Sequence, residues 1–105
     1  MKPLISSRIS KFYEVPPAHR LSKLHDLGAL DAAAREHWAN GGGIDVSLAD
    51  HLSENVISTH ALPLGLGLNF LINGRDVLVP MATEEPSVVA AASNAARMTR
   101  PMGGF

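Results

Sequence analysis

The chain has 105 residues, of which 46% are hydrophobic and 18% charged, and its formal net charge is -1. This near-neutral balance without a basic cluster argues against nucleic acid or an anionic membrane as the main partner, and the apolar composition excludes a disordered tail. Because the sequence has no cysteine, it also excludes a disulfide scaffold, a thiolate nucleophile and a cysteine-ligated metal centre. The length allows one small domain at most.

The start of the chain lacks the apolar core of a signal peptide, because the sequence MKPLISSRIS turns polar at Ser6 and Ser7. The most apolar stretch, residues 61–72, is shorter than the roughly 20 residues of a membrane-spanning helix and contains glycines. We therefore predict a cytoplasmic location and no association with a membrane.

The first 60 residues predict short helices with clear start and stop signals. Pro16 and Pro17 open a helix that Gly28 ends, since proline suits the first helical turn and glycine suits the residue after a helix. Asp31 is a suitable N-cap for a second helix over residues 32–40, because its carboxylate can accept from the free amides of the first turn.

A run of three glycines at positions 41–43 ends the second helix and predicts a flexible joint. Asp45 is the expected cap of a third helix, in which Leu48, Leu52 and Val56 recur on one face. Three helices of this length bury little surface by themselves, so we expect them to cover a larger structure.

Beyond Pro63 the hydrophobic pattern changes from a helical period to strict alternation, which predicts a β-strand over residues 64–72. Asn73 and Gly74 follow at once and favour a two-residue type I′ hairpin turn, because both residues accept positive φ. A turn of this length predicts apolar partners across the hairpin. The expected cross-strand pairs are Ile72 with Arg75, Phe70 with Val77, Leu68 with Val79, and Leu66 with Met81.

Gly65 and Gly67, on the other face of this strand, predict the close approach of another element, and Pro80 predicts a strand end or an edge strand. Pro86 suits the first position of a last, alanine-rich helix. Residues 62–96 are apolar on nearly every side, so we expect them either to pack against other chains or to belong to a larger protein. The expected fold class is α+β.

Two further patterns fail as ligand sites. The five histidines, at positions 19, 25, 37, 51 and 60, form no His-x-x-x-His pair that would place two imidazoles on one helical face, so we predict no metal site. The glycines at 65 and 67 begin like a dinucleotide-binding fingerprint, but Phe70 stands at the third glycine position and a hairpin turn follows.

Glu84 and Glu85 lie between the second strand and the last helix, and two interpretations of them are open. Acidic residues at a helix N-terminus are stabilised by the helix dipole and the free amides, which is a structural role. A carboxylate at a strand-to-helix turn is also well placed for proton transfer, which is a catalytic role. Local sequence does not decide between them.

Three runs of residues resemble the catalytic domain of hydroxymethylglutaryl-coenzyme A (HMG-CoA) reductases, specifically the bacterial-type class II enzymes. They are ENVI at residues 54–57, NFLINGRD at 69–76 and LVPMATEEPS at 78–87, and an apolar helix follows over residues 88–96. The resemblance implies an N-terminal fragment of such an enzyme. Residues 1–60 would form a helical region, and residues 61–105 a hairpin and helix of the large, substrate-binding domain.

The resemblance also implies a reaction and two site residues. The family interconverts HMG-CoA and mevalonate plus CoA in a four-electron step that uses two nicotinamide hydrides, from NADH or NADPH. Glu85 matches the catalytic glutamate, which exchanges a proton with the thioester-derived carbonyl oxygen, and Ser87 matches a serine that contacts the HMG portion of the substrate. The implied assembly is a homo-oligomer built from dimers, with the ENVI segment near the dimer interface.

The family's catalytic lysine, aspartate and histidine and its nicotinamide-binding small domain match nothing in these residues, so we expect the isolated chain to be inactive. The alternative is a non-enzymatic oligomerisation or partner-binding module that uses the apolar face of the hairpin. In that case Glu84 and Glu85 are only charges at a helix start.

Overall fold

The computed structural model describes residues 6–105. Residues 1–5, half of the segment from which we predict that no signal peptide is present, lie outside the described residues. Its class is α+β, as predicted. In chain order the elements are η1 (Phe12–Glu14), α1 (Pro17–Asp26), α2 (Ala32–Ala39), α3 (Val46–Leu52), β1 (Leu64–Ile72), β2 (Arg75–Ala82), α4 (Val88–Thr99) and η2 (Arg100–Met102).

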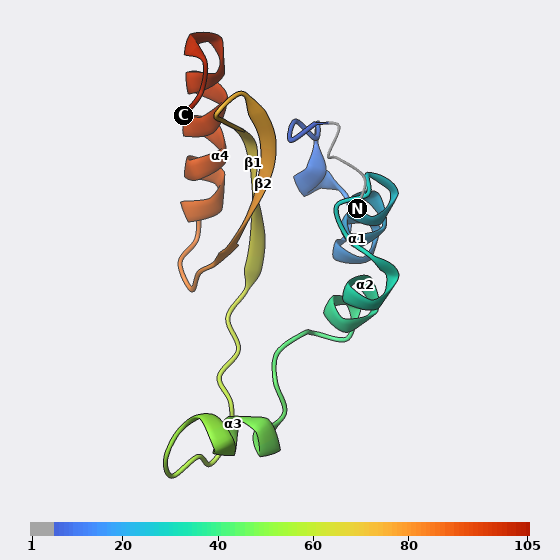
Figure 1. Ribbon diagram of the computed structural model, residues 1–105, viewed down its shortest axis with the longest axis vertical. Coiled ribbons are helices and arrows are strands. Elements are labelled where there is room, and N and C mark those ends of the chain that lie inside the picture. The colour runs from blue at the N-terminus through green and yellow to red at the C-terminus, as the bar shows by residue number, and fades with distance from the viewer. Residues whose placement is uncertain (1–5) are drawn as a thin grey trace.

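The hairpin of β1 and β2 lies in the middle of the molecule, with α4 along one side and α1 and α2 on the other (Figure 1). Helix α3 stands apart at the far end, at the tip of two long connections. The radius of gyration is 15.9 Å, whereas a globular chain of this length has about 13 Å. The prediction that all three short helices cover a larger structure is therefore wrong for α3, which lies apart from the hairpin, whereas α1 and α2 pack on each other beside it.

The expected caps of the second and third helices are confirmed. The Asp31 carboxylate accepts from the Ala34 amide at 2.8 Å, and the Asp45 carboxylate accepts from the Leu48 amide at 2.7 Å. Helix α3 ends at Leu52, so Val56 does not continue its apolar face as predicted. The side chain of Leu52 is 68% exposed, so this face has no cover within the described residues.

The hairpin turn is the type I′ turn that the sequence predicts, with φ of 50° at Asn73 and 76° at Gly74. The pairs nearest the turn are also confirmed, since Ile72 lies opposite Arg75 and Phe70 opposite Val77. Because the sheet has only two strands, β2 is an edge strand, which is the position expected for a strand containing proline.

Farther from the turn the predicted register is wrong by one residue. Val79 pairs with Gly67 instead of Leu68, and Met81 pairs with Gly65 instead of Leu66. Two residues of β1 lie between these parts of the ladder where β2 has one, which makes a β-bulge. Its second residue, Asn69, is left-handed with φ of 70°, a conformation that asparagine tolerates better than most residues.

Contacts from two other parts of the chain hold this bulge. From α4, the Ser93 hydroxyl accepts from the Leu68 amide at 2.9 Å, and the Ser93 carbonyl accepts from the Asn69 side-chain amide at 3.0 Å. From the N-terminal segment, the Ser7 carbonyl accepts from the Asn69 backbone amide at 3.0 Å. The bulge therefore satisfies its freed backbone groups through tertiary partners, which a pattern of alternating residues cannot reveal.

The close approach of another element that the sequence predicts is present at Gly65, whereas the neighbours of Gly67 all belong to the hairpin itself. A Cβ at Gly65 would lie 3.0 Å from a methyl carbon of Val89 in α4, so a larger residue would push the helix away. The small side chains of α4 allow this helix to lie directly along β1.

A polar cluster of Ser7, Asp76 and Arg100, here called the Ser7 cluster, joins the N-terminal segment, β2 and η2. The Ser7 backbone N–H donates to the Asp76 carboxylate at 2.7 Å, and the Arg100 guanidinium donates to the same carboxylate at 3.2 Å. Ser7 is fully buried. The hydrogen bond from the Ser7 amide, aided by Arg100, holds the pKa of Asp76 below its usual value against the opposing effect of burial.

Phe105 covers the edge of β1 near the turn. Its amide donates to the Leu71 carbonyl at 2.8 Å, and its carbonyl accepts from the Asn73 amide at 2.8 Å. Its ring stacks on Phe70 with the ring centroids 5.9 Å apart. Among the residues described, no helix has the length and apolar character needed to cross a membrane.

Candidate active-site turn

The turn between β2 and α4, residues 83–87, carries both residues that the sequence singles out for chemistry. Its entry is tied to the segment before β1, because the Thr83 amide donates to the Pro63 carbonyl at 3.1 Å. Its exit is the start of α4, where the Ala91 amide makes the first helical bond to the Ser87 carbonyl at 2.8 Å. Both ends of the turn are therefore fixed by backbone hydrogen bonds.

Helix α4 begins at Val88, so the prediction that Pro86 occupies the first helical position is wrong. The reason lies at Ser87, whose φ of 72° is left-handed and cannot belong to a right-handed helix. Pro86 instead stiffens the turn by fixing its own φ and restricting that of the residue before it.

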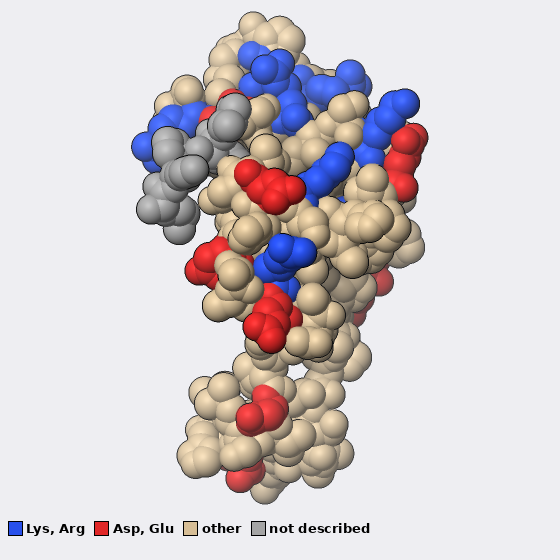
Figure 2. Space-filling model, turned by 90° about the vertical axis from the view of Figure 1, so that its right-hand side faces the viewer, with Lys and Arg blue, Asp and Glu red and all other residues tan. Residues whose placement is uncertain are grey.

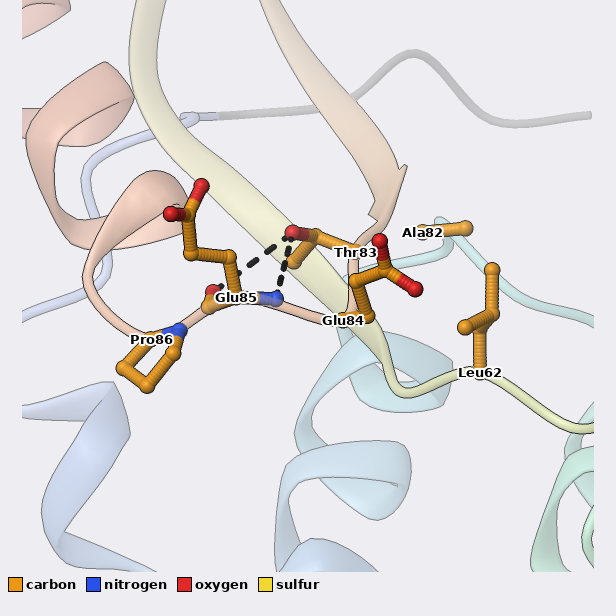
Figure 3. A pocket seen from close by; sticks show the side chains of 6 residues that line it. All are labelled: Leu62, Ala82, Thr83, Glu84, Glu85 and Pro86. Atoms are coloured by element: carbon orange, nitrogen blue, oxygen red, sulfur yellow. Dashed lines mark hydrogen bonds between the residues drawn. The ribbon is translucent and has the colours of Figure 1, made fainter.

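A pocket of about 560 Å³ opens at this turn. Figure 3 shows the residues that line it, which are Leu62, Ala82, Thr83, Glu84, Glu85 and Pro86. In this view the carboxylates of the two glutamates extend on either side of Thr83, with that of Glu84 toward Ala82. Both glutamates are exposed to solvent.

The threonine in the middle of this pocket contacts the backbone of Glu85 twice. Its hydroxyl accepts from the Glu85 amide at 3.1 Å and donates to the Glu85 carbonyl at 3.5 Å, as the dashed lines in Figure 3 mark. The backbone of Glu85 is therefore held on both sides of its Cα, while its side chain stays free to reach a ligand.

Ser87 lies next to the pocket at the N-terminal end of α4. Within the described part of the chain its hydroxyl caps no helix amide, so it is available to a ligand. The amides of the first turn of α4 give this end of the helix a partial positive charge. Carboxylate, hydroxyl and helix amides together suit a polar, oxygen-rich ligand.

Neither Glu84 nor Glu85 forms an ion pair with another described residue. The pocket lining contains no lysine or histidine, so within it only the two carboxylates can exchange a proton. Over the same described range, no group of three or more His, Asp or Glu residues is placed to hold a metal ion.

A second, larger hollow of about 1090 Å³ separates the hairpin from α1 and α2. Its lining is mainly apolar and includes Leu21, Leu24, Trp38, Leu64, Leu66 and Pro80. Leu64 and Leu66 lie on the face of β1 opposite Gly65 because successive strand residues alternate, and the shifted register places Pro80 across from Leu66.

The sequence profile of the hydroxymethylglutaryl-coenzyme A reductases matches residues 17–105, which include every element of the fold except η1. The chain belongs to this family. The matched range contains the pocket, the bulge and the whole of α4.

Two curated relatives and a solved structure agree with the HMG-CoA reductase assignment. The chain is 53% identical over 102 residues to 3-hydroxy-3-methylglutaryl-coenzyme A reductase of Archaeoglobus fulgidus, covering 96% of this chain and 23% of the relative. It is 44% identical over 95 residues to the probable reductase of Borreliella burgdorferi, covering 86% and 22%. The reductase of Streptococcus pneumoniae superposes with a TM-score of 0.84 at 38% identity, covering 90% and 23%.

This chain therefore spans about a quarter of the length of the reductases that it matches. A further structure from S. pneumoniae, with the same TM-score, is a class II reductase bound to NADPH in open conformations.

The sequence indicates the two glutamates and Ser87 as candidates, but the prediction missed Thr83, which holds the Glu85 backbone, and the residues that fix the bulge and the far end of α4. Thr83 lies two residues before Glu85, a spacing at which a threonine hydroxyl often bonds the following backbone. Asn69 is a residue type that strands disfavour, which signals the bulge. No local signal pointed to Ser7, because its partners Asp76 and Arg100 are 69 and 93 positions away.

Proposed function

We propose that this chain forms part of the large, substrate-binding domain of an oxidoreductase that interconverts HMG-CoA and mevalonate plus CoA. The observation that carries the proposal is the placement of Glu85, the second glutamate of the TEEPS turn. Its carboxylate is exposed in a pocket, and its backbone amide donates to the Thr83 hydroxyl. In the reductive direction two hydrides and two protons convert the thioester to a primary alcohol and release the CoA thiol. We assign residues 1–60 to the helical region and residues 61–105 to the hairpin and helix of that domain.

Glu85 is the proposed acid–base residue of the reaction. Its exposed carboxyl can give a proton to the carbonyl oxygen as hydride reaches the carbon, and can take it back in the reverse direction. Ser87, with a hydroxyl that caps no helix amide in the described part of the chain, is the proposed contact for the HMG portion of the substrate. Glu84 points to the other side of Thr83 and has no role in this proposal.

NADH or NADPH is the proposed cosubstrate and supplies the hydride. The described residues do not fit a nicotinamide dinucleotide, because Gly65 lies within β1 against Val89 and forms no phosphate-binding loop. The cosubstrate therefore has to bind to another part of the enzyme. The NADPH in the S. pneumoniae structure supports this class of cosubstrate, and the likeness to that structure supports the assignment to class II.

The proposed assembly is a homo-oligomer built from dimers in the cytoplasm. The arm formed by residues 43–63 supports association, because Leu52 and Ile57 on it are 68% and 95% exposed. Figure 2 shows this arm as a separate lobe with acidic side chains and no Lys or Arg.

The same arm supports the alternative, a non-enzymatic interaction module. Its apolar surface is more exposed than that of the hairpin, where Gly67 is buried and the Phe70 ring stacks on Phe105. The intact mass of the protein from its native source separates the two functions. A mass several-fold above 11.1 kDa supports the enzyme, whereas a native mass of 11.1 kDa supports the module.

The decisive test of the reductase is Glu85→Gln in the complete enzyme, with Glu84→Gln as the matched control. Removing the acid–base group should lower kcat for HMG-CoA-dependent NAD(P)H oxidation by about 100-fold or more, since such catalysis contributes roughly 10²–10⁴-fold. The control should retain kcat within about twofold, as expected of an exposed side chain outside the chemistry. Full activity of Glu85→Gln would reject the assignment.

A further inference from the structure

We propose that Thr83 is a positioning residue for Glu85, and that its hydroxyl sets the direction in which the Glu85 carboxyl enters the pocket. This inference rests on the proposed role of Glu85 and extends it to a residue that the sequence reasoning passed over. The single hydroxyl of Thr83 contacts both the amide and the carbonyl of Glu85.

The two contacts restrict the backbone on either side of the Glu85 Cα. The hydroxyl accepts from the amide at 3.1 Å, within the normal range, and its own proton is directed to the carbonyl at 3.5 Å, which is a weaker interaction. A rotation of either peptide plane would break one of them. The Cα–Cβ bond, and with it the origin of the carboxyl side chain, is therefore fixed relative to Thr83.

Thr83 can serve as a support because it is itself anchored. Its amide donates to the Pro63 carbonyl at 3.1 Å, which ties it to the segment that enters β1. Its side chain is half-buried, whereas both glutamates are exposed. The contacts of its hydroxyl with the Glu85 backbone are themselves exposed to solvent, so the support that Thr83 gives comes from its anchored position.

The residues after Glu85 restrict it from the other side. Pro86 disfavours the helical region for the residue before it, which narrows the backbone conformations open to Glu85. Ser87 is held in a left-handed conformation with φ of 72°. With one end held by the Thr83 hydroxyl and the other by Pro86, the backbone of Glu85 is ordered before substrate binds, and less entropy is lost on reaching the reactive geometry.

The experiment compares three threonine variants in the complete enzyme. Thr83→Val keeps the shape of the side chain and removes the hydroxyl, whereas Thr83→Ser keeps the hydroxyl. Thr99→Val is the matched control, because the Thr99 hydroxyl donates to the Ala96 carbonyl at 2.9 Å at the opposite end of α4. All three leave the backbone hydrogen bonds of their residues intact.

Thr83→Val should lower kcat about tenfold, the most that one neutral hydrogen bond typically contributes, with KM for HMG-CoA unchanged within about twofold. Thr83→Ser should restore kcat to within about threefold of the parent, and Thr99→Val should leave kcat and KM unchanged. An equal loss in Thr83→Val and Thr83→Ser would overturn the inference, because the hydroxyl would then be irrelevant. A Thr83→Val enzyme that is impaired only in KM, with kcat unchanged, would also overturn the inference.

A double variant tests whether Thr83 acts through Glu85. In the Glu85→Gln background, adding Thr83→Val should change the residual kcat by less than about twofold, because a group that positions the acid has no effect once the acid is gone. A full tenfold further loss would overturn the inference. The outcomes also separate the two proposals. Full activity of Glu85→Gln rejects the proposed function, whereas an inactive Glu85→Gln with a fully active Thr83→Val rejects only the role of Thr83.

Discussion

The two ends of helix α4 differ in how they are held. At the C-terminal end the Ser7 cluster ties Arg100 to the hairpin and the N-terminal segment, and Phe105 bonds to the edge of β1. At the N-terminal end the glutamates are exposed, Ser87 is left-handed, and a single threonine hydroxyl holds the backbone. One end is closed by buried polar contacts and the other is open to a ligand.

This difference indicates how a short, alanine-rich helix can present a reactive turn. Helix α4 contributes little apolar area, so its position depends on hydrogen bonds to the bulge through Ser93 and on the close contact of Val89 with Gly65. The closed end should therefore carry stability and the open end should carry activity. Substitutions of residues next to the two ends of α4, and of the bulge residue that bonds to its middle, test that division.

The largest loss of stability is expected from Gly104→Ala at the closed end. A Cβ there would collide with the Leu71 backbone and would require φ of 73°, so the bonds between Phe105 and β1 must break. We expect a loss of about 3 kcal/mol in the free energy of unfolding, measured by urea titration. Gly103→Ala is the control, because its Cβ meets nothing within 4 Å and should cost only about 1 kcal/mol of backbone strain. Equal losses in the two would contradict the packing of Gly104.

A smaller loss, about 2 kcal/mol at neutral pH, is expected from Asp76→Asn, which removes the charge that Arg100 and the Ser7 amide bind. The lowered pKa of Asp76 gives this stability a pH dependence. Because the unfolded carboxyl binds a proton more readily, near its usual pKa of about 3.9, the contribution is complete above that pH. This contribution to the free energy of unfolding is lost as the pH falls below the usual carboxyl pKa toward the lower pKa of the folded state.

Urea titrations from neutral pH down to about pH 2 check this expectation, since they span the window in which a lowered carboxyl pKa acts. The loss of unfolding free energy at low pH that comes from protonation of Asp76 should be absent in Asp76→Asn. Asp26→Asn is the control, because its side chain is 80% exposed and should leave both the stability and its pH profile as they are. An unchanged acid profile in Asp76→Asn would argue against the Ser7 cluster.

Asn69, which lies in the bulge of β1 and bonds to Ser93 in the middle of α4, tests how that part of the helix is held. Asn69→Ala loses the side-chain bond to Ser93 and places alanine at φ of 70°, so we expect a loss of about 1.5 kcal/mol in unfolding free energy. Asn69→Gly loses the same bond without the left-handed strain and should cost less. If glycine were as destabilising as alanine, the left-handed conformation would not matter to the register.

The smallest change, and one of opposite sign, is expected from Ser87→Gly at the open end. Glycine relieves the strain at φ of 72°, partly offset by its greater freedom in the unfolded chain, so stability should rise by about 0.5 kcal/mol. If the hydroxyl contacts the HMG portion, KM for HMG-CoA should rise in the complete enzyme at the same time. Greater stability with an unchanged KM would leave Ser87 without a binding role.

Much of the local structure follows from the sequence because its causes are local. Asp31 and Asp45 cap the helices that they precede, and Asn73 with Gly74 form the predicted turn. Glu85 could be named as a candidate because carboxylates at strand-to-helix turns and the surrounding TEEPS motif are both readable along the chain. What failed was the register beyond Phe70, the start of α4, and the expected length and packing of α3.

The error in register has a tertiary cause, and the later start of α4 follows from the backbone of one residue. The alternation from Leu64 to Ile72 assumes a regular strand, whereas Ser7 and Ser93, distant in sequence, bond to Asn69 and stabilise an extra residue in β1. Pro86 has the right chemistry for a helix start, but the left-handed Ser87 delays α4 to Val88. At the bulge, a local strand preference worth a fraction of a kcal/mol gave way to hydrogen bonds worth more.

The sequence by itself thus determined the fold class, the caps, the hairpin turn and the candidate Glu85, since these depend on residues a few positions apart. Only the tertiary structure decided the register of β1 beyond Phe70, the anchoring of Thr83 to Pro63, and which end of the helix is closed. Those features depend on whether donors and acceptors from distant segments find one another in the folded chain, and alternation or spacing along a sequence carries no record of that.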